Sequence, residues 1–404
     1  MRRQLRLLLV AAALGSAMSV APGAPMSGFV AEAAEQTIGA KVGAPLKAAQ
    51  DLAKAGKYAD ALKKVAEADA MSGKTAYESF VVDDFLVFLK VKLHDYAGAA
   101  KAAEAALASG MVPAADRSQR MKTLIQLNYQ AKNYEKVAAL ARQYEQQVGA
   151  DADIGLLALQ AYYLQKDFPN AQRAAKALAA SARAAGKKPA ENILQLWLSS
   201  AAQQKDRAGS RAALMQLVSD YPSPAYWKNL LDVVASEIGR SDRMSFEIFR
   251  LKLATGTLQS SGDYTEMAQL AIQLGLPGEA KSIMEKGFAA KVLGGSNKSR
   301  EERLLNMAKA QAGQDEPTLG DNAPTPKAKA ALGEAYASYG KVDKAIALYR
   351  EALTSPFAEA DLTRLHLGQG LLAKGDAAGA RKAFAAVRDT KLVNLANIWN
   401  LVAR

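Results

Sequence analysis

The sequence predicts an all-α protein, an α-solenoid built of stacked antiparallel helix hairpins. One residue pattern is written twice between Pro326 and Val387, with a period of 35 residues. Earlier in the chain, a turn with an aromatic residue recurs at Tyr58, Tyr96 and Tyr134, which are 38 residues apart. Runs of alternating β-branched residues are absent, so strands have little support. Such recurrence is typical of hairpins that stack because one hairpin cannot bury its own apolar stripe.

The two copies of the C-terminal pattern share the same residue types at the same places. Each copy has a cation, a leucine, a glycine and a large side chain in its first helix, then an alanine and an aromatic residue in its second. The first copy consists of Lys329, Leu332, Gly333, Tyr336, Ala345 and Tyr349. The second copy consists of Arg364, Leu367, Gly368, Leu371, Ala380 and Phe384.

This spacing resembles the tetratricopeptide repeat. The resemblance implies a superhelix of helix hairpins that binds other proteins along the concave face of its first helices. The lysine and asparagine clamp with which some family members hold a terminal carboxylate is not reproduced in this chain. The resemblance therefore does not extend to the binding of chaperone tails.

The first 33 residues have the three-part layout of a secretory signal peptide. Three arginines lie in 1–6, an apolar run follows in 7–14, and small residues lead to a cleavage pattern at Ala31-Glu32-Ala33. The apolar run is too short to span a bilayer stably. We therefore expect residues 1–33 to be removed and the mature chain to begin at Ala34. The alternative is an apolar start on a cytosolic protein.

The composition favours a periplasmic protein. The chain of 404 residues contains no cysteine, so it has neither a disulfide framework nor thiol chemistry. No stretch after the signal is apolar for about 18 residues, so we expect no transmembrane helix in the mature chain. An exported chain without cysteine fits a bacterial periplasm best.

Residues 34–312 are predicted to form an N-terminal helical-repeat array. Each turn aromatic is followed three residues later by a small residue, which lets the second helix cross its partner closely. These small residues are Ala61, Ala99, Val137 and Ala171. Weaker hairpins pair 191–202 with 208–218, 224–236 with 243–253, and 264–274 with 278–291. A lone helix at 299–311 is expected to begin with a capping box of Ser299 and Glu302.

The last part of the chain is predicted to hold the two clear repeats, in residues 326–404. Residues 313–325 are acidic, contain Pro and Gly, and lack an apolar period, so they form a linker or a long loop. A hinge and an ordinary loop inside one solenoid both stay open at this point. Residues 392–402 present apolar side chains on one face, which predicts a terminal capping helix.

The sequence offers little support for catalysis. It contains only two histidines, His94 and His366, which excludes a metal centre built on three histidines. Gly368–Ala373 matches a dinucleotide fingerprint only loosely and lies inside a predicted helix, whereas that fingerprint follows a strand. We expect no catalytic residue, no metal and no cofactor, and we interpret the chain as a non-enzyme. The remaining enzyme hypothesis is a site between the two arrays.

The middle of the array suggests a ligand groove. Amide and tyrosine side chains gather on the open face of the first helices between about residues 119 and 203, where they could bond an extended polypeptide or a glycan. These residues are Lys122, Gln126, Tyr129, Gln130, Gln160, Tyr163, Asn192, Gln195 and Gln203. The alternative is that they are ordinary polar surface residues.

The basic charge suggests a second kind of partner. The formal net charge is +12, and Lys187, Lys188, Lys298 and Arg300 lie in or beside predicted loops. Such groups attract anionic envelope polymer or lipid headgroups, although ordinary solvated loop charges are the favoured explanation. No nucleic-acid-binding module is present, so we expect no nucleic acid partner. The main hypothesis is a protein-interaction scaffold with protein partners in the cell envelope.

Overall fold

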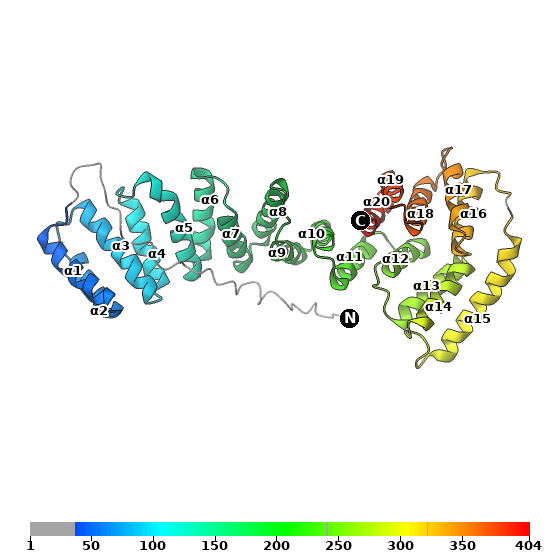
Figure 1. Cartoon of the computed structure of the whole chain (residues 1–404), viewed down its shortest axis with the longest axis horizontal. Helices are drawn as coiled ribbons and strands as arrows, with labels where there is room; N and C mark the ends of the chain where they lie inside the picture. Colours follow the sequence, from blue (N-terminus) through cyan, green and yellow to red (C-terminus); the bar gives the residue numbers. More distant parts are fainter. Residues whose placement is uncertain (1–36, 240, 321) are drawn as a thin grey trace. The chain divides into compact units, whose positions relative to one another are not determined.

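The computed structural model describes residues 37–239, 241–320 and 322–404 (Figure 1). These residues form twenty α-helices and one short 3₁₀ helix, and they contain no strand. The prediction of an all-α chain of helix hairpins is confirmed. The predicted signal peptide at 1–33 lies outside the described residues. No helix in the described part is long and apolar enough to cross a bilayer.

The chain divides into two compact units between Gln204 and Lys205. The sequence-based division at residues 313–325 stays a prediction. In the first unit, consecutive helices pack as antiparallel hairpins, and the first helices of neighbouring hairpins also touch, as in α5 with α7 and α7 with α9. Its helices are α1 (Ala40–Lys54), α2 (Tyr58–Asp69), α3 (Ala76–Lys92), α4 (Tyr96–Ala108), α5 (Ala114–Gln130), α6 (Tyr134–Gln147), α7 (Ala152–Leu164), α8 (Phe168–Ala184) and α9 (Glu191–Gln203).

The small residues that were expected at the helix crossings are buried. Ala61, Ala99, Val137 and Ala171 have no exposed surface. Because an alanine or valine at these places lets the two helix backbones approach, the aromatic that opens each second helix can pack beside the turn. The turn spacing in the sequence therefore reports real hairpins.

The residue two places before each second helix has a left-handed backbone. His94, Lys132 and Lys166 have φ angles of 60°, 59° and 62°. Gly56 occupies the same place in the first hairpin, with φ 73°. A non-glycine residue in this conformation costs about 1–2 kcal/mol, which the packing of the hairpin must offset.

The second unit closes on itself. Its last helix, α20, packs against α18 and α19 and also against α10 and α12 at the beginning of the unit. The predicted capping helix is therefore present, and it covers both ends of this unit. The helices are α10 (Arg207–Asp220), α11 (Pro224–Glu237), α12 (Asp242–Ala254), α13 (Ser261–Gln273), α14 (Pro277–Ala289), α15 (Lys298–Asp315), α16 (Pro326–Ser338), α17 (Val342–Ala352), α18 (Ala360–Ala373), α19 (Ala377–Ala385) and α20 (Leu392–Val402).

The glycines of the two clear repeats make room for an aromatic ring. A Cβ atom added at Gly333 would lie 2.7 Å from Cε1 of Tyr349, and one added at Gly368 would overlap the ring of Phe384. Tyr349 and Phe384 are almost fully buried. The glycine and the aromatic thus form one packing unit in each repeat, which explains why the sequence repeats both.

The predicted capping box at Ser299 is wrong. Helix α15 begins one residue earlier, after Asn297, and no side chain caps it. Ser299 is already inside the helix, and the neighbouring Glu301 accepts a hydrogen bond from the Gly294 amide at 2.7 Å, which ties down the preceding loop. The helix also continues to Asp315, beyond the predicted end at Gln311.

Candidate functional site

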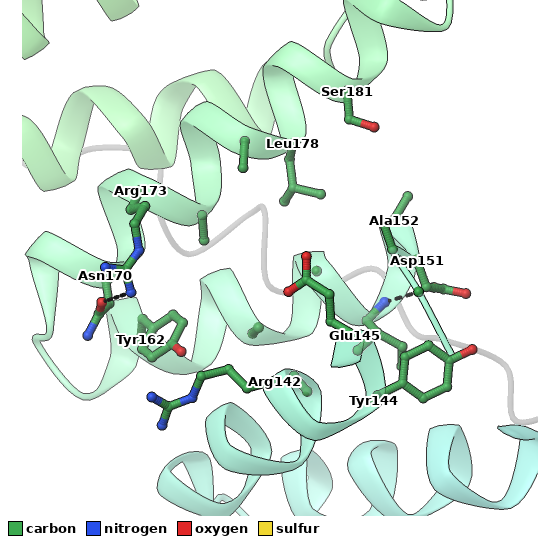
Figure 2. A pocket seen from close by; sticks show the side chains of 18 residues that line it. Arg142, Tyr144, Glu145, Asp151, Ala152, Tyr162, Asn170, Arg173, Leu178 and Ser181 are labelled. Atoms are coloured by element: carbon green, nitrogen blue, oxygen red, sulfur yellow. Dashed lines mark hydrogen bonds between the residues drawn. The ribbon is translucent and has the colours of Figure 1, made fainter. Parts of the chain in front are cut away.

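A cavity of about 390 Å³ lies between α6 and α8, with α7 as its floor (Figure 2). Ile154, Gly155, Ala158 and Tyr162 of α7 form the floor. Both α6 and α8 are second helices of their hairpins, and α7 is the first helix that separates them. The site is therefore built from one complete hairpin and the second helix of the hairpin before it.

Small side chains create the open space. Alanines line the cavity on all three helices and on the loop before α7, namely Ala141, Ala150, Ala152, Ala158, Ala174 and Ala177. On the floor, a Cβ atom at Gly155 would lie only 2.8 Å from Cδ2 of Leu178. Leu178 thus covers Gly155, and its side chain and the surrounding alanines make the centre of the cavity apolar.

The charged residues at the two ends of the cavity differ in sign. Arg142 of α6 and Arg173 of α8 lie toward one end, and Asp151 lies toward the other (Figure 2). Arg142 Nε donates to the Ala138 carbonyl at 3.3 Å, and the Arg173 guanidinium donates to Asn170 Oδ1. Neither arginine pairs with a carboxylate anywhere in the described part of the chain. Both keep most of their N–H donors available.

Two carboxylates of the cavity have different roles. Asp151 caps α7 by accepting from the amides of Asp153 and Ile154, at 3.0 and 3.1 Å, and it pairs with Lys122 at 2.5 Å. Burial opposes its charge, but Lys122 and these amides outweigh burial and lower the pKa of Asp151. Glu145 has no ion pair within the described residues, and its carboxylate rises from α6 into the cavity (Figure 2). Glu145 is thus available to a ligand, whereas Asp151 is already used by the fold.

The residues of the predicted groove lie on α5, α7 and α9. By the helical period, Gln160 of α7 faces away from Gly155 and Ala158, whereas Tyr163 lies on the flank of the helix, so the predicted groove and the observed cavity are on different faces of this helix. Gln130 and Gln203 are exposed, and the other members are half-buried. Those others are Lys122, Gln126, Tyr129, Gln160, Tyr163, Asn192 and Gln195.

Several members of this set already have partners within the unit. The Tyr163 hydroxyl lies 2.7 Å from Ser199 Oγ and joins α7 to α9, and the Gln195 amide donates to Glu191 at 3.3 Å. Tyr129 packs edge-on against Tyr134 at 5.7 Å, and burial raises its pKa. Of these contacts, the one between Tyr163 and Ser199 joins neighbouring hairpins, whereas the other two lie within one helix or one hairpin. A binding role for these residues stays a prediction.

The second unit contains a buried charge cluster that the sequence did not reveal. Arg250 donates to Glu247 at 2.8 Å, to Glu279 at 2.7 Å and to Glu334 at 3.3 Å. His366 lies 2.9 Å from Glu247 and 3.1 Å from Arg250. The cluster joins α12, α14, α16 and α18.

This cluster is better described as an ionic lock than as a metal site. One ligand atom each from Glu247, Glu334 and His366 lies within 4.8 Å of the others, which is close enough to share an ion. However, the guanidinium of Arg250 already contacts all three residues and supplies the positive charge. Although Glu247 is fully buried, Arg250 and His366 hold its pKa well below the usual range. A metal ion at this place would be repelled by the positive charge of Arg250 and could bind only if the Arg250 side chain were displaced.

The basic residues of the predicted polymer-binding surface lie in different units. Lys187 and Lys188 are exposed in the connection between α8 and α9, and Arg300 is exposed near the beginning of α15. Lys298 lies 3.8 Å from Glu302 of the same helix. Each site offers only one or two cations in an exposed setting, where salt screens their attraction.

Comparisons with known proteins bear on the fold alone. No protein-family model matches the chain, and no curated protein matches it in sequence. A chain of the Naa15/Naa10 complex bound to HypK-THB is 14% identical with a TM-score of 0.39, over 86% of this chain and 53% of that one. This chain thus spans about half the length of that protein.

Two further solved structures are similarly distant. A tetratricopeptide repeat protein from Parabacteroides merdae is 11% identical with a TM-score of 0.32, over 73% of this chain and 99% of the other. Yeast Tom70 is 13% identical with a TM-score of 0.24, over 88% and 94%. Similarity at this level does not carry a function from those proteins to this one. The recurrent hairpins, the buried small residues at their crossings and the glycine–aromatic pairs of the chain itself make its fold an all-α array of helix-hairpin repeats.

Proposed function

We propose that this protein is a non-catalytic interaction scaffold that binds an extended polypeptide in the groove between α6 and α8. The observation that carries the proposal is the cavity of about 390 Å³ lined by small apolar residues. Ligand pockets in proteins have volumes of about 300–1,000 Å³. A cavity of this size can bury a few side chains of an extended segment, but it cannot enclose a folded domain.

The electrostatics of the groove also favour a polypeptide. Its apolar centre suits an aliphatic side chain, whereas Arg142, Arg173 and Glu145 can bond polar groups on either side of it. Binding that depends on an apolar centre surrounded by a polar rim is typical of protein interfaces. The exposed charges alone would favour only a weak, salt-sensitive attraction.

The proposal is tested by filling the groove. Ala177 lines the cavity from α8 and is exposed, so Ala177→Trp adds a large ring without disturbing the core. Ala180 is exposed on the same helix but outside the cavity, and Ala180→Trp is the matched control. Both variants and the natural protein are used to capture partners from an envelope extract, followed by mass spectrometry. We expect a partner set that Ala177→Trp loses and Ala180→Trp keeps.

The same experiment distinguishes the two faces of the array. Changing Tyr129, Tyr163 and Gln195 together to Ala removes the side chains of the predicted groove on a different face of α7. Partners lost in this triple variant but kept in Ala177→Trp would overturn the assignment to the α6–α8 groove and would favour the original groove. Equal capture by all variants would contradict both sites.

A location in the bacterial periplasm is part of the proposal and is supported by the pattern of residues 1–33 alone. Fusing these residues to an alkaline phosphatase that is active only after export tests it directly. We expect the fusion to have phosphatase activity. This activity should be lost when Leu7–Leu14 are replaced by polar residues. An inactive fusion would contradict export by this segment.

Binding of anionic envelope polymer or lipid headgroups remains the second candidate, because Lys187, Lys188 and Arg300 are exposed. The two candidates differ in their response to salt. Attraction to a polymer falls steeply as sodium chloride is raised, whereas burial of an apolar side chain does not. Partner capture that survives about 0.5 M salt would therefore favour the groove.

A further inference from the structure

We infer that the groove between α6 and α8 selects a polypeptide segment in which one acidic side chain stands beside a small apolar side chain. The acid would lie between Arg142 and Arg173, and the apolar side chain would lie on Ala158 beside Leu178. This inference rests on the proposed function, because it names the partner chemistry of the same groove.

The two arginines form the polar half of the site. They project from different helices, and each uses only part of its guanidinium for a bond within the fold, to the Ala138 carbonyl and to Asn170. No carboxylate of the described residues neutralises either of them, although ion pairs are common elsewhere on this surface. A guanidinium presents a planar fork of donors that matches a carboxylate, so two of them favour an Asp or Glu side chain.

The floor forms the apolar half. The side chains of Ile154 and Ala158 are buried and contain only carbon atoms, and the side chain of Leu178 covers Gly155. Because Leu178 Cδ2 lies 2.8 Å from where a Cβ of Gly155 would be, Leu178 itself fills the space over the glycine and narrows the cavity. A small aliphatic side chain such as Ala or Val fits such a floor better than an aromatic ring.

Glu145 limits how many acids the segment can carry. It lies three residues after Arg142 on α6, its carboxylate enters the cavity (Figure 2), and no cation of the described residues pairs with it. A second acidic side chain near Glu145 would be repelled. The site is thus suited to a single acid and discriminates against a polyanion, which separates it from the basic loops.

The test begins with a library of random decapeptides displayed on phage and selected on the full chain. Counter-selection on the Ala177→Trp variant removes peptides that bind outside the groove. The enriched peptides are expected to share one Asp or Glu next to Ala or Val. Enrichment of neutral or basic peptides would overturn the acidic preference while leaving the proposed function intact, because such peptides still need the groove.

The second step measures an enriched peptide by fluorescence polarisation. We expect Arg142→Gln with Arg173→Gln to weaken binding by about tenfold or more, since charge-assisted hydrogen bonds are lost. Arg183→Gln is the matched control, because Arg183 is exposed on α8 and does not line the cavity. An unchanged affinity in the double variant would overturn the inference. Failure to enrich any peptide that Ala177→Trp loses would overturn the proposed function as well.

Discussion

The buried charge cluster of the second unit gives the sharpest stability prediction. The change is Arg250→Met, which keeps an unbranched, largely apolar stem and removes the guanidinium with its charge and donors. Arg250 is mostly buried and bonds Glu247, Glu279 and Glu334, and the Glu247 side chain has no exposure at all. Without Arg250, Glu279 would lose its ion pair and the buried Glu247 would keep only His366 and Gln369, although Arg243 would still pair with Glu334.

The magnitude follows from that geometry. Removing one partner of a buried ion pair costs about 3–5 kcal/mol, because the other charge stays uncompensated. With a dependence of about 2–3 kcal/mol per molar urea, the midpoint of unfolding should fall by roughly 1–2.5 M. Lys228→Met is the matched control, since Lys228 pairs with Asp232 one turn away on an exposed surface. It should change stability by less than about 0.5 kcal/mol.

The assay can be confined to the second unit. The chain has three tryptophans, of which Trp197 is in the first unit and Trp227 and Trp399 are in the second. In a Trp197→Phe background, the fluorescence change during urea unfolding reports the second unit alone. A midpoint for Arg250→Met that differs from the background by no more than that of Lys228→Met would refute the interpretation of the cluster as a lock.

Three further predictions concern pH, packing and turns. The pKa of Glu247 is lower in the folded protein than its ordinary value of about 4.3, so ionised Glu247 stabilises the fold above that value and this stabilisation is lost as pH falls through the folded pKa. Glu247→Gln should therefore lose less stability between neutral and acid pH than the natural protein, as measured by urea unfolding at each pH. Gly333→Ala should destabilise by about 1–3 kcal/mol in the same assay because Tyr349 leaves no room, whereas Gly313→Ala, on an open helix surface, should stabilise by up to about 1 kcal/mol. Lys132→Gly, which relieves a φ of 59°, should raise the thermal midpoint, whereas Gln143→Gly within α6 should lower it. Acid titrations with equal slopes, a neutral Gly333→Ala or a Lys132→Gly that destabilises would each contradict its explanation.

Local features of the fold could be predicted because their causes are local in sequence. A turn, an aromatic residue and a small residue lie within a few positions of one another, and their recurrence at Tyr58, Tyr96 and Tyr134 therefore marks each hairpin. The glycine–aromatic pairs of the last two repeats are also local, since Gly333 and Tyr349 belong to one hairpin. The closure of α20 onto α10 joins residues almost 200 positions apart, and no periodicity signals it.

The sites were harder to predict for the same reason. Glu247 and His366 are separated by 119 residues, so nothing near either one indicates that they meet. In α8, the sequence pattern predicts small residues only in the role of bringing helices together, at Ala171. At Ala174 and Ala177 they face α6 across an open space instead. The sequence signal that could have revealed the cavity is the occurrence of small residues on three successive helices, at Ala141, Gly155 and Ala174.

Crosslinking in living cells tests the groove most directly. A photoreactive amino acid is placed at Ser181, which lines the cavity, or at Ala180, which does not. The account predicts polypeptide adducts from position 181 that disappear when Ala177→Trp is added, and few from position 180. Adducts of equal amount from both positions, or adducts from 181 that survive Ala177→Trp, would contradict it.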